Sequence, residues 1–164
     1  MPFRTESVMR FEYELTGIGW ADGSIEMNSS TVYFSTSYIT DALNDMLKAI
    51  NALIPEVSPY SVSRVQFEWN EEPGGTVWTL SKIDNDSLRV QIISFENLRN
   101  KKQKVIELDE TCSILEFTGA VVQALDLLLK QYGREGYKEK WVNNDFPMDR
   151  YLKLKGFTSK KRLS

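Results

Sequence analysis

Three runs of alternating apolar and polar residues, separated by short turns, constrain the fold of this chain more than any other feature. The runs cover residues 65–69, 77–80 and 88–93. A period of two predicts a β-strand with one buried face. The turns between the runs, residues 71–75 and 84–86, are too short for a crossover, so neighbouring strands must pair antiparallel. The sequence therefore predicts an antiparallel meander.

Two further extended runs come before the meander. Residues 9–15 alternate between apolar and mostly charged side chains, and a second run covers residues 24–34. The apolar parity of the second run changes at residues 28–30, which predicts a bulge or a short break in the strand. Glycines within residues 17–23 predict a turn. We expect the two runs to form a hairpin with a long tip.

Two amphipathic helices are predicted from apolar residues at spacings of three and four. The first begins after residues 35–37, any of which is a suitable N-cap, and it ends at Pro55. The second runs from about Ser113 to Tyr132, where Gly133 is placed to end it.

The expected fold class is α+β. The elements follow the order strand, strand, helix, three strands and helix, with an optional strand at residues 105–109 before the second helix. Antiparallel strand groups with few helices are typical of this class. The predicted architecture is an antiparallel sheet of about five or six strands, with two main amphipathic helices packed on one face and the other face wet.

The chain is predicted to form a single globular α+β domain over residues 8–156. Its 164 residues match the usual size of one domain. A last short helix is expected to open at Pro147 and to close at Gly156. Residues 1–7 and 157–164 are expected to be flexible termini.

The residue inventory excludes several common chemistries. The chain has no histidine, which removes the commonest general base and the commonest metal ligand. Ser–His and Cys–His nucleophilic pairs are excluded for the same reason. One cysteine permits neither an intrachain disulfide nor a cysteine-rich zinc site. Cys112 lies at the start of the second helix, where a thiol can become reactive, but we expect it to be buried as a small hydrophobe. We predict no cofactor and no metal.

Carboxylate pairs offer one route to catalysis without histidine. Glu71–Glu72 and Asp84/Asp86 are the nearest candidates. Both pairs fall in predicted turns, where acidic residues are usually solvated and keep an ordinary pKa. We therefore predict no catalytic residues and keep a carboxylate-dependent enzyme as an alternative.

Charge is distributed unevenly along the chain. Residues 1–98 hold 6 Lys and Arg against 14 Asp and Glu, a net of −8, whereas residues 99–164 hold 14 against 9, a net of +5. An acidic surface steers a basic partner and speeds association, although it also serves simply as a solvated face. The candidate partner-binding residues are three on outer strand faces and four in turns: Glu12, Glu14, Glu68, Glu71, Glu72, Asp84 and Asp86.

Trp20 is a further candidate because it lies at the predicted hairpin tip. A tryptophan at a tip either folds back as a lid on the core or stays exposed as an anchor for a partner. The other tryptophans of the strands, Trp69 and Trp78, are expected in the core.

Nucleic acid and membrane are not expected partners. The basic segment at residues 160–162 comes with no nucleic-acid-binding motif, and the pI of about 5.2 is that of an acidic protein. The apolar segments are all shorter than the roughly 18 residues that a spanning helix needs. The first residues contain no apolar stretch typical of a secretory signal. We expect a cytoplasmic protein.

Three stretches together resemble a family of small, uncharacterised bacterial single-domain α+β proteins: STSYITDALNDMLKAINALI, FEWNEEPGGTVWTL and QYGREGYKEKWVNNDFP. Such proteins are similar to those encoded near secreted polymorphic toxins, where acidic immunity proteins are common. The resemblance implies a non-enzymatic, immunity-like partner of a basic protein, and it implies no active-site residue. A structural, self-associating domain is the third function considered.

Overall fold

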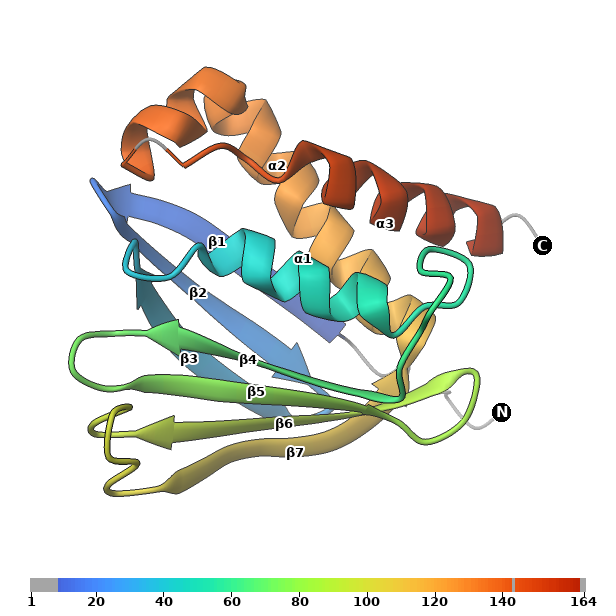
Figure 1. The fold of residues 1–164 in the computed structure, drawn as a ribbon, viewed down its shortest axis with the longest axis horizontal. Coiled ribbons are helices and arrows are strands. Elements are labelled where there is room, and N and C mark those ends of the chain that lie inside the picture. The colour runs from blue at the N-terminus through green and yellow to red at the C-terminus, as the bar shows by residue number, and fades with distance from the viewer. Residues whose placement is uncertain (1–8, 143, 163–164) are drawn as a thin grey trace, which may run out of the picture.

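The computed structural model describes residues 9–142 and 144–162, and within them the chain forms seven strands and three helices (Figure 1). The strands are β1 Met9–Gly17, β2 Trp20–Met27, β3 Ser30–Ser37, β4 Arg64–Asn70, β5 Gly75–Lys82, β6 Ser87–Phe95 and β7 Val105–Ser113. The helices are α1 Ala42–Ala52, α2 Ile114–Lys140 and α3 Met148–Arg162.

The strands divide between two antiparallel sheets, one with the order β1-β2-β3 and one with the order β4-β5-β6-β7. The α+β class and the antiparallel meander are confirmed. The single sheet of five or six strands that we expected is instead a three-stranded and a four-stranded sheet. The optional strand at residues 105–109 is present as β7 and pairs with β6.

The predicted first hairpin is a three-stranded unit. Residues 28 and 29 form a tight turn between β2 and β3, with Met27 opposite Ser30. Asn28 has a φ of +57°, a conformation that asparagine tolerates better than most residues. The parity change at this point therefore marks a turn between two antiparallel strands, and the single run expected over residues 24–34, with a bulge or a short break, is wrong. The expected long tip is also short, because Trp20 already belongs to β2.

Two of the predicted helix boundaries are wrong. Residues 35–37 lie in β3, and α1 begins only at Ala42, with Asp41 at its N-cap position. Gly156 does not close the last helix, which continues to Arg162. A glycine interrupts a helix only weakly when the chain keeps helical dihedral angles. Residues 157–162 of the expected flexible terminus are thus helical, while residues 1–8 and 163–164 lie outside the described part of the chain.

The boundaries of α2 follow the sequence more closely. The Ser113 hydroxyl caps the helix by accepting a hydrogen bond from the Glu116 N–H at 2.9 Å. Gly133 breaks the helical conformation with φ +68° and ψ 178°, and a further helical segment follows it to Lys140. Glycine is suited to this point because a side chain is strained at such dihedral angles.

The core lies where the inner faces of the two sheets meet the helices. Phe34 of β3 packs on Trp69 of β4 with ring centroids 5.0 Å apart, and Trp69 lies 5.1 Å from Trp78 of β5. Both tryptophans are fully buried, as expected. The Trp69 Nε1–H also donates to the backbone oxygen of Ala42, which fixes the start of α1 over the sheets. Helix α2 packs along β1, α1 along β4, and α3 on both helices (Figure 1).

Candidate functional site

The acidic residues predicted on outer strand faces do not share one surface. Glu12 and Glu14 lie on β1 of the three-stranded sheet, whereas Glu68 lies on β4 of the four-stranded sheet. Because the inner faces of these sheets pack on each other, their outer faces point away from one another. Glu68 is also engaged in an ion pair with Lys101 at 2.6 Å. The structure therefore separates Glu68 from the other two.

The acidic turn residues are also separated. Figure 1 places the β4–β5 turn, with Glu71 and Glu72, and the β5–β6 turn, with Asp84 and Asp86, at opposite ends of the four-stranded sheet. Asp84 accepts hydrogen bonds from the backbone N–H groups of Asp86 and Ser87, and these bonds lower the pKa of Asp84. Its carboxylate holds the turn together.

The three-stranded sheet presents a group of carboxylates that we call the acidic face: Glu12, Glu14, Asp22 and Glu26. All four alternate with buried residues along β1 and β2 and so lie on the outer side of the sheet. Asp22 was missed from the sequence because its strand was predicted to start only at residue 24, and Glu26, inside the predicted run, was not named as a candidate. Extending the alternation back to Trp20 would have found Asp22.

Two members of the acidic face lie directly opposite each other. Glu14 pairs with Asp22 in the β1–β2 register. Like charges at such positions destabilise a sheet. The Ser35 hydroxyl donates a hydrogen bond to Oδ1 of Asp22 at 2.6 Å and offsets part of this cost. The packing of the fold does not require the acidic pair, because both side chains are exposed.

Tyr33 stands on the same outer side of the sheet as the acidic face. It lies on β3 opposite Ser24, and 81% of its surface is exposed. Arg10, opposite Glu26, is the one basic side chain on the outer side of β1 and β2 within the described residues. The surface thus combines four carboxylates with an aromatic ring.

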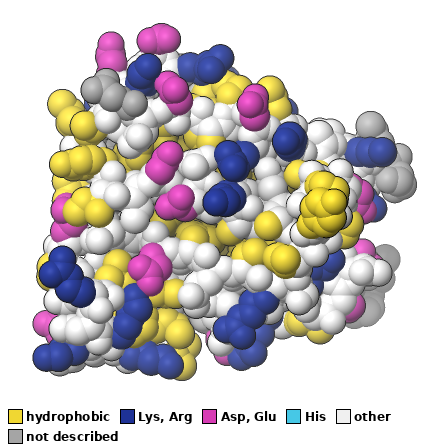
Figure 2. All heavy atoms as spheres, viewed as in Figure 1, with side chains coloured by type: hydrophobic (Ala, Val, Ile, Leu, Met, Phe, Trp, Pro, Cys, Tyr) yellow, Lys and Arg dark blue, Asp and Glu magenta, His cyan; other side chains and the backbone are white. Residues whose placement is uncertain are grey.

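An apolar patch lies at the end of the molecule that carries the β1–β2 turn, and we call it the tip patch. Its members are exposed large side chains: Ile18, Trp20, Tyr38, Ile39 and Val142. A Cβ built on Gly19 would lie 2.7 Å from Cδ1 of Tyr38 and 3.3 Å from Cγ2 of Val142, so both side chains pack over this turn. Hydrophobic side chains also gather along the left edge of Figure 2, at the end of the molecule where Figure 1 shows the β1–β2 turn.

Trp20 connects the tip patch to the acidic face. It alternates with Ala21 and therefore lies on the same outer side of β2 as Asp22, with 37% of its surface exposed. The side chain is neither a fully buried lid nor a fully exposed anchor. Of the predicted candidates, the structure brings Glu12, Glu14 and Trp20 together on one surface, with Glu71 at its border through a bond to Ser35.

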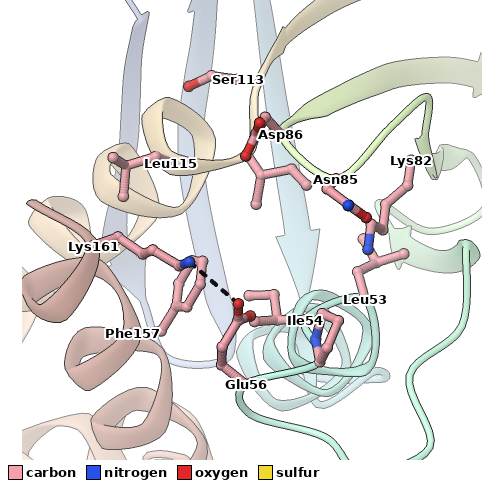
Figure 3. A pocket seen from close by; sticks show the side chains of 12 residues that line it. Leu53, Ile54, Glu56, Lys82, Asn85, Asp86, Ser113, Leu115, Phe157 and Lys161 are labelled. Atoms are coloured by element: carbon pink, nitrogen blue, oxygen red, sulfur yellow. Dashed lines mark ion pairs between the residues drawn. The ribbon is translucent and has the colours of Figure 1, made fainter. Parts of the chain in front are cut away.

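A cavity of about 560 Å³ lies at the opposite end of α1, and we call it the helix-end cavity (Figure 3). Its walls come from the end of α1, the β5–β6 turn, the start of α2 and the end of α3. Glu56 and Lys161 reach toward each other across it and form an ion pair at 3.3 Å. Of the predicted residues, only Asp86 lines this cavity.

The carboxyl groups with a raised pKa lie elsewhere, at the start of α1. Burial raises the pKa of Asp41, and repulsion by Asp45 adds to the effect. Burial also raises the pKa of Asp45, which lines an open groove of about 650 Å³ with Glu68. The carboxylate pairs named from the sequence, Glu71–Glu72 and Asp84/Asp86, include neither group.

The remaining chemical groups give little support to catalysis. Cys112 is half-buried, and burial raises its pKa to about 12, which keeps the thiol protonated. Among the described residues, no three acidic or cysteine side chains are grouped so that they could hold a metal ion. None of the described helices combines the length and hydropathy needed to cross a membrane.

Comparison with known proteins adds no assignment: no family model matches the chain, and neither the curated proteins nor the solved structures give a significant match.

Proposed function

We propose that this protein is a non-enzymatic binding domain that docks a basic protein on the acidic face and the tip patch. The observation that carries the proposal is the directly opposed pair of Glu14 and Asp22. Its repulsion costs stability, and the core gains nothing from it. Sites that conflict with local stability are commonly functional, and a cationic partner would relieve the repulsion.

The composition of the surface suits a protein partner. Exposed carboxylates attract Lys and Arg side chains over a distance and speed the encounter. Aromatic residues such as Trp20 and Tyr33 are enriched among the side chains that dominate binding energy. The tip patch supplies apolar area next to the charged area, as in an interface with an apolar centre and a polar rim.

An immunity-like role is the specific form of this proposal. A protein that inhibits a basic toxin by binding it needs a stable fold and an acidic surface, and it needs no catalytic activity. The resemblance of residues 35–54, 67–80 and 131–147 to proteins of toxin neighbourhoods supports this form, and so does the net charge of −8 over residues 1–98.

The test is capture of partners from a lysate of the native host at low and high salt. The bait is the full chain, compared with a Glu14→Lys variant and with a Glu135→Lys variant that makes the same charge change on exposed α2. We expect a basic protein to be retained at low salt by the native chain and by Glu135→Lys, and to be lost with Glu14→Lys. Purified partner and chain should then form a complex of fixed stoichiometry.

Glu14→Lys also reports on folding. Replacing one member of the like-charged pair should stabilise the hairpin by about 0.2–1 kcal/mol. A variant that is at least as stable as the native chain and yet loses the partner separates binding from folding. Equal retention by Glu14→Lys and the native chain would overturn the proposal. A chain that light scattering shows to be a dimer, with no retained partner, would favour the self-associating domain instead.

A further inference from the structure

The helix-end cavity has the size of a small-molecule site. Its volume of about 560 Å³ falls within the range of ligand pockets, roughly 300–1,000 Å³. Four segments that are far apart in sequence build it: residues 53–56, 82–86, 113–115 and 157–161. Figure 3 shows their side chains arranged around one space.

One side of the cavity is apolar. Leu53, Ile54 and Ile114 are almost fully buried beneath it, and Leu115 and Phe157 are partly buried at its wall. These side chains come from the segment that follows α1, from the start of α2 and from the last turns of α3. Contact with these side chains would remove the apolar surface of a bound molecule from water, which favours binding.

Two lysines and two carboxylates line the cavity: Lys82, Lys161, Glu56 and Asp86. Glu56 is paired with Lys161 at 3.3 Å, and the charge of Lys82 also acts on the Glu56 carboxylate. A backbone hydrogen bond first, and then both lysines, lower the pKa of Glu56. Two ammonium groups thus share one carboxylate, and Lys82 makes no ion pair of its own within the described chain.

The second carboxylate of the cavity wall, Asp86, lies at the start of α2. Its backbone oxygen accepts the N–H of Ile114 at 2.8 Å, which places Asp86 beside the first turn of α2. The N-terminus of a helix carries a partial positive charge that favours a carboxylate nearby.

We propose that the helix-end cavity binds a small amphipathic molecule, with its apolar body on Leu115 and Phe157 and its anionic head group on Lys82. The helix-end cavity is separate from the acidic face, so this proposal does not depend on the proposed function.

The experiment uses a matched pair of fluorescent probes on the full chain. One is 8-anilinonaphthalene-1-sulfonate, which joins an apolar ring system to an anion. The other is N-phenyl-1-naphthylamine, which has the same rings without the charge. We expect saturable binding of both, with the sulfonate bound more tightly by the native chain.

Three variants locate the site. Lys82→Met keeps the aliphatic stem and should weaken sulfonate binding by up to about fivefold, the upper end of the range for one exposed charge pair, while binding of the neutral probe stays unchanged. Phe157→Ala should weaken both probes. Trp20→Ala, at the tip patch, should affect neither. Circular dichroism confirms that each variant is folded before titration.

Several results would overturn the proposal. Absence of saturable binding by the folded native chain would do so, as would equal affinity of the native chain for the two probes. Binding that Trp20→Ala abolishes and Lys82→Met leaves intact would assign the probes to the tip patch. Loss of the preference for the sulfonate in Lys82→Met alone would support the assignment to the helix-end cavity.

Discussion

The backbone N–H of Ser35 donates a hydrogen bond to Oε1 of Glu71 at 2.9 Å, and this bond joins the edge of the three-stranded sheet to the β4–β5 turn. Strand β3 pairs with β2 on one side, and the Glu71 carboxylate takes the place of a strand partner for one N–H on the other side. Edge strands expose unpaired backbone groups, and covering them stabilises a sheet.

Glu71→Ala should destabilise the protein by about 1–2 kcal/mol, because it leaves a part-buried N–H without its charged acceptor. Glu71→Gln keeps an acceptor oxygen and should lose less. Urea denaturation gives the free energies of unfolding. Glu12→Ala, on the exposed side of β1, is the control and should stay within about 0.5 kcal/mol of the native chain. Equal effects of Glu71→Ala and Glu12→Ala would contradict the structural role.

Gly23→Ala tests the close packing of the three-stranded sheet. A Cβ at this position would lie 2.1 Å from the Glu12 backbone oxygen and 2.7 Å from the Phe34 ring. The backbone cannot shift without disturbing the β1–β2 register, so we expect a loss of about 1–3 kcal/mol. The measurement is the midpoint of urea unfolding.

Gly156 provides the matched control for that substitution. A Cβ on Gly156 would meet nothing within 4 Å, and the residue lies inside α3. Alanine favours a helix over glycine by about 0.8–1.0 kcal/mol. Gly156→Ala should therefore raise the stability, and a stabilising Gly23→Ala would show that the sheets pack less tightly than the structure has them.

The sequence was sufficient for the elements whose signals are local. The meander of β4 to β6 follows from alternation and short turns, and the start of α2 follows from the N-cap at Ser113. The burial of Trp69 and Trp78 follows from their positions in the alternation. Each of these features depends on neighbouring residues and needs no knowledge of distant contacts.

The division into two sheets depends on contacts that alternation does not encode. A strand with one buried face reads the same whether that face meets a helix or another sheet. Phe34 packs on Trp69 across the two sheets, a contact between residues far apart in sequence. For the same reason, the sequence did not predict that Glu68 and Glu14 lie on different sheets. Alternation shows which face of its strand a residue lies on, but it does not show which strands pair with that strand.

Asp41→Asn should change how stability depends on pH. Burial, and then repulsion by Asp45, raise the pKa of Asp41 in the folded state. The folded state therefore holds a proton that the unfolded state has lost, and stability falls as pH rises from the ordinary Asp pKa through the raised one. The variant lacks this loss and keeps a residue suited to an N-cap. It should be more stable than the native chain at neutral pH.

Unfolding in urea at descending pH checks this expectation, and the gap between variant and native chain should close as Asp41 becomes protonated. Asp84→Asn is a control of opposite sign. Backbone hydrogen bonds lower the pKa of Asp84, so the native chain should be the more stable one at neutral pH and lose that advantage as pH falls. Parallel pH profiles for the two variants would contradict the environments that the structure gives these carboxyls.

Cys112 should react slowly with iodoacetamide in the folded protein. Burial, with a smaller contribution from Glu116, raises the pKa of this thiol from 9.0 to about 12, and only the thiolate is the nucleophile. Three pKa units correspond to roughly a thousandfold smaller thiolate fraction at mildly alkaline pH. Mass spectrometry of the alkylated chain should show slow modification without denaturant and fast modification in concentrated urea. Equal rates in both conditions would mean that the thiol is exposed, and α2 would then have to pack on β7 more loosely than the structure has it.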